Sequence, residues 1–180
     1  MNVNKQLVVD KTTSIFEKLN ADSPINRALI ADLRKRNAEN IEEDIKAWKV
    51  IYSVDWGEEV SEYDQKLLSR ALYASLVIYA SQRRKGGSHN FEALPLGKVF
   101  AMIGRDKENF DSKVTALFSS EQLDSLVRKI KTILRLSSVS YSLDYTKLTY
   151  DLYRVQKEDP RRIYMAWGMD YYRKEKKGEE

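Results

Sequence analysis

The chain has 180 residues, with 31 Lys or Arg against 27 Asp or Glu, a net charge of +4, and 42% hydrophobic residues. This length is enough for a buried core in one domain or two small lobes. The absence of Cys excludes disulfides, thiolate metal sites and a thiol nucleophile, and a single His excludes a multi-His metal site.

The charges are unevenly distributed along the chain. Residues 1–64 carry 9 Lys or Arg against 13 Asp or Glu, which leaves 22 against 14 in residues 65–180. An acidic first third and a basic remainder suggest one surface for an anion and another for a different partner. The longest apolar run, 71–80, is shorter than the roughly 20 residues that span a membrane. No secretory signal is recognisable, so we expect a soluble cytoplasmic protein without a membrane partner.

Helical periodicity runs through the whole chain, and no strand-like alternation is found. We predict helices at 5–19, 23–36, 41–52, 62–84, 95–103, 110–118 and 119–136, and two more that begin at Asp144 and at Asp159-Pro160. The segment 62–84 is apolar on nearly every side, as expected of a helix surrounded by others. The predicted fold is all-α, a compact helical bundle of about seven to nine helices in two lobes, with residues 1–108 and 109–180.

The most informative segment is the basic helix predicted over 120–136. Ser119 is expected to cap it, with Gln122 reaching back to the cap. Its apolar residues recur every three or four positions and should face the core: Leu123, Leu126, Val127, Ile130, Ile133 and Leu134. Arg128, Lys131 and Arg135 align beside that face, with Lys129 on the opposite flank. This basic stripe is either an ordinary solvated face or a surface that follows phosphates.

Further basic residues gather at helix ends and loops. Arg27 and Arg34 lie one heptad apart, Arg83, Arg84 and Lys85 precede Gly86-Gly87, and Arg105 follows a short helix. Cations near a helix C-terminus are also explained by the helix dipole alone. Arg161 and Arg162 fall in a first helical turn, where the dipole disfavours cations. They indicate an anionic partner, which could be a protein carboxylate or DNA.

Catalysis is not indicated by the sequence. One His, no Cys and no carboxylate pair within an apolar pattern leave no recognisable acid–base or nucleophile set. We therefore expect no enzymatic activity, no cofactor and no metal.

An ordered set of segments resembles a known family. The segments are RALIADLRK, ALYASLVIYASQRRKGGSHNF, PLGKVFAMIG, QLDSLVRKIKTILRL, SLDYTKLTYDLYRVQ and DPRRIYMAWGMDYY, within residues 25–175. They resemble the small subunit of Cascade, the type I-E CRISPR RNA-guided surveillance complex. The last three resemble the family's Leu-rich basic helix, its Asp-aromatic helix start and its terminal Trp-containing helix.

The resemblance implies a non-enzymatic subunit of an antiviral complex, present in two copies beside the backbone and large subunits. It implies binding of single-stranded DNA, with double-stranded DNA and CRISPR RNA as further candidate ligands. Sequence-independent phosphate contacts would then stabilise the R-loop, including the displaced non-target strand. The alternative is a structural helical adaptor that bridges subunits without binding DNA. The candidate nucleic-acid contacts are Arg27, Arg34, Arg83, Arg84, Lys85, Arg105, Arg128, Lys129, Lys131 and Arg135.

Overall fold

The computed structural model describes residues 3–83, 92–104 and 107–173. Within them the chain forms nine α-helices, one 3₁₀ turn (η1) and two very short strands, which confirms the predicted all-α bundle. In order these are α1 Lys5–Asn20, α2 Pro24–Leu33, η1 Ala38–Glu42, α3 Ile45–Ile51, α4 Glu62–Gln82, β1 Ala93–Leu94, α5 Leu96–Gly104, α6 Phe110–Phe118, α7 Leu123–Arg135, β2 Ser142–Leu143, α8 Tyr145–Lys157 and α9 Pro160–Tyr172.

Three of the predicted helix starts are confirmed by their caps. The Ser23 hydroxyl accepts from the Asn26 amide at 3.2 Å, and Pro24 is the first helical residue. The Asp144 carboxylate accepts from the Lys147 amide at 2.8 Å, and the Asp159 carboxylate accepts from the Arg161 amide at 3.0 Å. A cap of this kind satisfies one of the amides that the first turn leaves without a helical partner.

Other boundaries differ from the prediction. The second helix ends at Leu33 rather than Arg36, and the third begins at Ile45 after the η1 turn, with Asp44 as its cap. The start predicted at Ser119 is wrong: Ser119 ends α6 and its hydroxyl donates to the Ala116 carbonyl at 2.8 Å. α7 begins at Leu123, after Gln122, which makes no side-chain capping bond. A local pattern could not show that the hydroxyl would turn back to the preceding helix.

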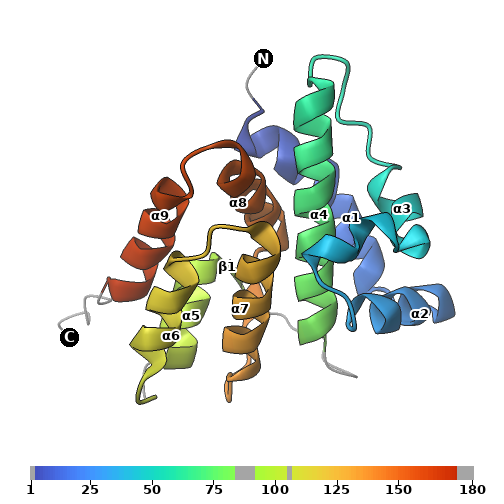
Figure 1. The fold of residues 1–180 in the computed structure, drawn as a ribbon. Coiled ribbons are helices and arrows are strands. Elements are labelled where there is room, and N and C mark those ends of the chain that lie inside the picture. The colour runs from blue at the N-terminus through green and yellow to red at the C-terminus, as the bar shows by residue number, and fades with distance from the viewer. Residues whose placement is uncertain (1–2, 84–91, 105–106, 174–180) are drawn as a thin grey trace.

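The core is organised around α4. Its residues from Ala71 to Ala80 are all buried, as predicted for a helix that is apolar on every side. Figure 1 shows α4 standing between α2 and α3 on one side and α7 and α8 on the other, and it packs against all four. The parallel pair β1–β2, which the periodicity did not reveal, joins the chain ahead of α5 to the chain ahead of α8.

Helices from both predicted lobes pack on each other. α1 packs on α8, and α5 packs on α9. The second contact is very close, because a Cβ added at Gly97 would lie 2.3 Å from the Trp167 carbonyl oxygen. The division into lobes at residue 108 stays a prediction.

A charge cluster with a buried carboxylate at its centre joins the start of α4 to the end of α8. The Asp64 carboxylate accepts from Lys157 Nζ at 2.5 Å, from the Tyr153 hydroxyl at 2.7 Å and from the Ser61 hydroxyl at 2.9 Å. Burial by itself raises the pKa of the Asp64 carboxyl, but the hydrogen bonds from Lys157, Tyr153 and Ser61 outweigh it and leave this pKa below 3.8. The folded state therefore favours the ionised carboxylate.

Replacement of this carboxylate tests its contribution. Asp64→Asn should lower the free energy of unfolding by roughly 1–3 kcal/mol at neutral pH, since it leaves Lys157 without its counter-charge. A carboxyl with a depressed folded pKa stabilises above its unfolded pKa and loses that contribution as pH falls through the folded value. The difference from wild type should be constant above about pH 5 and shrink below 3.8.

Chemical denaturation across this pH range measures the effect. Asp10→Asn, on the exposed surface of α1, is the matched control and should change stability by less than about 0.5 kcal/mol. An Asp64→Asn difference that persisted undiminished at pH 3 would contradict a role for the ionised carboxylate.

Candidate nucleic-acid interface

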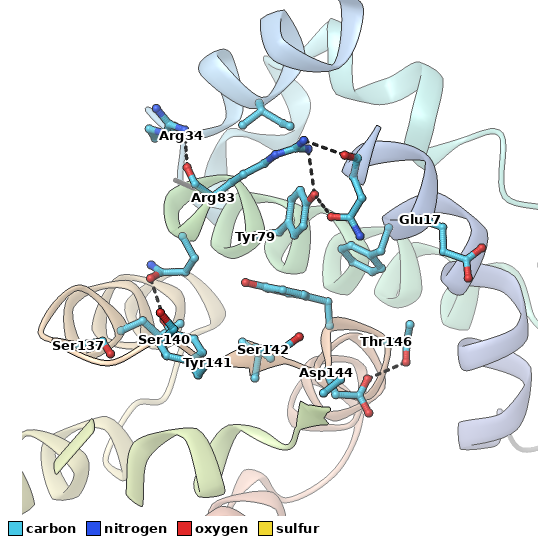
Figure 2. A pocket seen from close by; sticks show the side chains of 18 of the residues that line it. Glu17, Arg34, Tyr79, Arg83, Ser137, Ser140, Tyr141, Ser142, Asp144 and Thr146 are labelled. Carbon is cyan, nitrogen blue, oxygen red and sulfur yellow. Dashed lines mark hydrogen bonds between the residues drawn. The ribbon is translucent and has the colours of Figure 1, made fainter. Parts of the chain in front are cut away.

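Three of the predicted basic residues converge on one cleft of about 1190 Å³. Arg27 and Arg34 come from α2 and its end, and Arg83 comes from the end of α4. The opposite wall is the segment 137–146, which joins α7 to α8 (Figure 2). The structure thus brings together cations that lie more than fifty residues apart in sequence.

Arg34 and Arg83 are held in place by backbone carbonyls at the ends of helices. Arg34 donates to the Ala80 carbonyl at 3.2 Å and to the Arg83 carbonyl at 2.9 Å. Arg83 donates to the Leu19 carbonyl, to the Asn20 carbonyl at 3.0 Å and to the Tyr79 hydroxyl at 3.1 Å. These carbonyls lie at the negative ends of α4 and α1, so the dipole explanation for both cations is correct. The same bonds fix both guanidinium groups at the cleft.

Arg27 is different, because among the described residues no backbone carbonyl holds its guanidinium group. Its one described partner is Asp22, at 2.9 Å, and both side chains are exposed. An ion pair of two exposed groups contributes little and exchanges readily for another anion. The cleft also contains Glu17 and Asp144, so its charge is mixed rather than uniformly positive.

The remaining lining combines aromatic rings and hydroxyl groups. Phe16, Tyr79 and Tyr145 form a ring cluster with centroids 5.1–5.7 Å apart. Burial raises the pKa of the Tyr145 hydroxyl well above its usual 10, so this ring stays neutral. Tyr141 donates to the Gln82 side chain at 2.9 Å, and the serines of the opposite wall add further hydroxyl groups. Phe16 and Tyr79 are buried in this cluster, so the lining offers a ligand hydrogen-bonding groups and the half-buried ring of Tyr141.

The basic residues of α7 do not form the single exposed stripe that was predicted. Lys131 is only 8% exposed, and its Nζ donates to the Arg36 carbonyl at 2.7 Å. Burial lowers the pKa of Lys131, and the neighbouring Arg135 and Arg128 lower it further. The expectation failed because the chain between α2 and η1 covers this position, a contact that a helical pattern cannot reveal.

The other α7 cations are also partly engaged. Arg128 pairs with Glu39 of η1 at 2.5 Å, and Lys129 donates to the Ala116 carbonyl of α6 at 2.7 Å. Arg135 lies exposed at the end of the helix. Arg84, Lys85 and Arg105 lie outside the described residues. A nucleic-acid role for each of the ten candidates stays a prediction.

The wall 137–146 was not predicted from the sequence, where most of it lies between the helix predicted to end at 136 and the helix predicted to begin at Asp144. Its signal is compositional: Ser137, Ser138, Ser140 and Ser142 alternate with Val139 and Tyr141. A run of hydroxyl-bearing residues next to an aromatic residue suits a polar ligand as well as a solvent-exposed turn. Only the fold shows that it faces arginines from distant parts of the sequence.

Two other classes of site were considered. Among residues 3–83, 92–104 and 107–173, no three His, Cys, Asp or Glu side chains gather in a way that could hold a metal ion. In the same ranges no helix combines the length and apolar character needed to cross a lipid bilayer.

Comparison with known proteins gives two agreeing results. The sequence model of the CRISPR-associated protein Cse2 family matches residues 29–172. The crystal structure of CasB from Thermobifida fusca superimposes with a TM-score of 0.71 over 94% of this chain and 97% of that chain, at 19% sequence identity. At this identity the superposition shows only that the two proteins share a fold. The family match covers most of the sequence and therefore shows the family. No curated protein sequence matches the chain significantly.

The buried position of Lys131 generates a test. Lys131→Met keeps the length of the side chain and removes its charge, so we expect the free energy of unfolding to change by less than about 1.5 kcal/mol. Because Nζ faces the Arg36 carbonyl, the salt dependence of DNA binding should equal that of wild type. Arg135→Gln, which removes an exposed charge from the same helix, is the comparison. A reduced salt dependence for Lys131→Met would show that this lysine leaves its buried position to contact phosphate.

Proposed function

The chain belongs to the Cse2 family, the small subunit of the type I-E CRISPR Cascade complex, and we propose that it is a non-catalytic subunit that binds nucleic acid through the cleft. The contacts would be to phosphates and independent of base sequence. They would stabilise the R-loop, above all the displaced non-target strand, during antiviral defence. The proposed place of action is the cytoplasm, where the complex would meet invading DNA.

The convergence of Arg27, Arg34 and Arg83 on one cleft carries the proposal. Two of the guanidinium groups are already fixed by carbonyls, so little side-chain freedom would be lost when a phosphate binds. Arg27 would exchange the exposed Asp22 for a phosphate. Arg84 and Lys85, which follow Arg83 directly in sequence, remain candidate contacts.

The rest of the lining suits a ligand of arbitrary sequence. Hydroxyl groups donate to phosphate and sugar oxygens, and an aromatic ring can stack on any base. A guide-directed complex needs this indifference, because the target changes with each guide. Since exchange of a DNA duplex for a guide–target heteroduplex is nearly balanced in free energy, modest contacts to the displaced strand are enough to favour the open state.

The alternative is a structural adaptor that bridges the backbone and large subunits, or a second copy of the chain, without contacting DNA. A specific observation favours it: Arg128, Lys129 and Lys131 bind groups of the chain itself, which leaves α7 less positive charge for a phosphate. Glu17, Asp22 and Asp144 also reduce the positive potential of the cleft. The adaptor hypothesis predicts that the chain assembles into the complex although the free chain does not bind DNA.

The test is binding of labelled single-stranded DNA by the purified chain at several salt concentrations. The proposal predicts a logarithmic salt dependence with a slope of several units, equal for DNA of different sequences. Arg27→Gln removes one phosphate contact, so it should reduce the slope by about 0.7 and weaken binding about fivefold at roughly 0.1 M salt.

Arg70→Gln is the matched control. Arg70 is exposed on α4, lines a separate, smaller hollow and carries the same charge. Equal effects of the two substitutions would indicate non-specific attraction to net charge rather than binding in the cleft. Absence of binding by wild type at low salt would favour the adaptor. Duplex DNA and CRISPR RNA, tested in the same way, would establish which nucleic acid the cleft prefers.

A further inference from the structure

The inner face of α9 is rigidly attached to the rest of the molecule. Trp167 is fully buried, and its indole nitrogen donates to the Asp151 carboxylate at 2.9 Å. The Tyr164 hydroxyl donates to the Ser120 carbonyl at 2.8 Å, and Gly97 of α5 allows the two helix backbones to approach closely. Whatever the outer face of α9 contacts would therefore meet a preformed surface.

That outer face exposes a ridge of large apolar side chains. Met165, Met169 and Tyr172 are 68%, 58% and 57% exposed. Their spacing of i, i+4 and i+7 places them in one row along the helix, the kind of ridge that packs into the groove of another helix. The Tyr172 ring is held edge-on against Tyr171 at 4.6 Å, and methionine adapts readily to a partner surface. Figure 1 shows α9 at the outer edge of the bundle.

Cations stand at the N-terminal end of this ridge. Arg161 and Arg162 occupy the first turn of α9, where they add to the positive end of the helix dipole instead of offsetting it. Arg161 shares the capping carboxylate of Asp159, yet its side chain is 83% exposed. Arg162 is exposed and forms no close ion pair in the described part of the chain, although its charge helps to lower the pKa of Glu158 and Asp159. An acidic partner would remove this electrostatic conflict.

Gly168 adds an independent observation. It lies three residues after Met165 and four before Tyr172, so it flanks the ridge. A Cβ added there would meet only the Phe118 ring, at an ordinary distance of 3.5 Å. Gly in a helix interior is unfavourable relative to Ala, and nothing in the chain requires it here, in contrast to Gly97. We refer to the position of this missing side chain, next to the Phe118 ring, as the notch.

We propose that the outer face of α9 docks an amphipathic helix from another protein subunit of the complex. An apolar side chain of that helix would enter the notch at Gly168, its apolar stripe would pack on Met165 and Met169, and its carboxylates would face Arg161 and Arg162. The assignment of the partner to the same complex rests on the function proposed above. The surface itself is separate from the cleft.

The chemistry favours this occupant over others. A row of thioether and aromatic side chains does not match a phosphate backbone, whose binding needs cations along its whole length. A stable homodimer buries about 800 Å² on each copy, which exceeds what one row of three side chains provides. Two copies paired through the same face would also each bring two first-turn arginines to the interface. A helix of another subunit avoids both the small contact area and the repulsion between arginines, because its subunit gains further contacts elsewhere in the assembly.

The test measures the affinity of the purified chain for the other Cascade subunits assembled without it. Met169→Glu and the double substitution Arg161→Glu with Arg162→Glu should each weaken binding about tenfold or more. The first buries a charge against the apolar stripe of the partner, and the second places negative charge against its carboxylates. Ile25→Ser is the control: Ile25 is even more exposed, on α2, and its replacement should leave the affinity unchanged. Equal loss for all variants, or loss for none, would overturn the proposal.

Gly168→Ala separates docking from folding, because its two effects should have opposite signs. It should raise the Tm of the isolated chain by roughly 2 °C, since Ala is the better helix former. It should also weaken docking several-fold by filling the notch. A stabilised variant with unchanged docking would exclude the notch as part of the interface.

Two further measurements identify the occupant. Self-association in sedimentation that Met169→Glu abolishes would assign the ridge to a second copy, and binding to phosphatidylglycerol vesicles that it abolishes would assign the ridge to a lipid surface. Either result overturns the proposal. DNA binding by the isolated chain, measured in parallel, tests the cleft independently. Failure of the proposed function and failure of the docking proposal therefore remain distinguishable.

Discussion

The burial of α4 on all sides over residues 71–80 is the constraint from which the other features follow. A helical segment without a polar face has to be surrounded, and α2, α3, α7 and α8 pack around α4. The free backbone groups and the charged side chains at its two ends must then find hydrogen-bond or ion-pair partners on these neighbouring helices. At the start, Asp64 binds Lys157 and Tyr153 of α8, which fixes the register between the two helices. At the other end, carbonyls of the last turn accept from Arg34.

The cleft exists because of this second requirement. Arg34 and Arg83 are present where α2, α4 and α1 end, since helix C-termini attract cations. The structural and the ligand-binding explanations of these residues are therefore compatible. A guanidinium group has five N–H donors, and the carbonyls engage only some of them. Substitution of either arginine would disturb the fold and the site together, which makes Arg27 the more informative residue.

The sequence was sufficient wherever the decisive interactions are local. The starts at Ser23-Pro24, Asp144 and Asp159-Pro160 depend on residues within three positions, and all three were predicted. Lys131 was misjudged because its partner, the Arg36 carbonyl, is far away in sequence. The prediction that Ser119 caps α7 was wrong for a different reason. A hydroxyl between two helices can bond to the end of one or to the start of the other, and here it donates to the Ala116 carbonyl of α6. The cleft combines the ends of three helices with the 137–146 wall, and no local pattern specifies that arrangement.

The position of α9 makes the two candidate functions, nucleic-acid binding and a structural adaptor, compatible with each other. Its inner face is fixed by Asp151 and Ser120, neither of which lines the cleft, and its outer residues belong to a different surface. A subunit that stabilises an R-loop has to transmit the force on the displaced strand to the rest of the complex, so it needs a protein contact as well as a nucleic-acid contact. Because α8 packs on both α4 and α9, it connects the helix that ends at the cleft with the outer helix. If the chain binds DNA as proposed, an adaptor surface on α9 is thus a requirement of that function and does not compete with it.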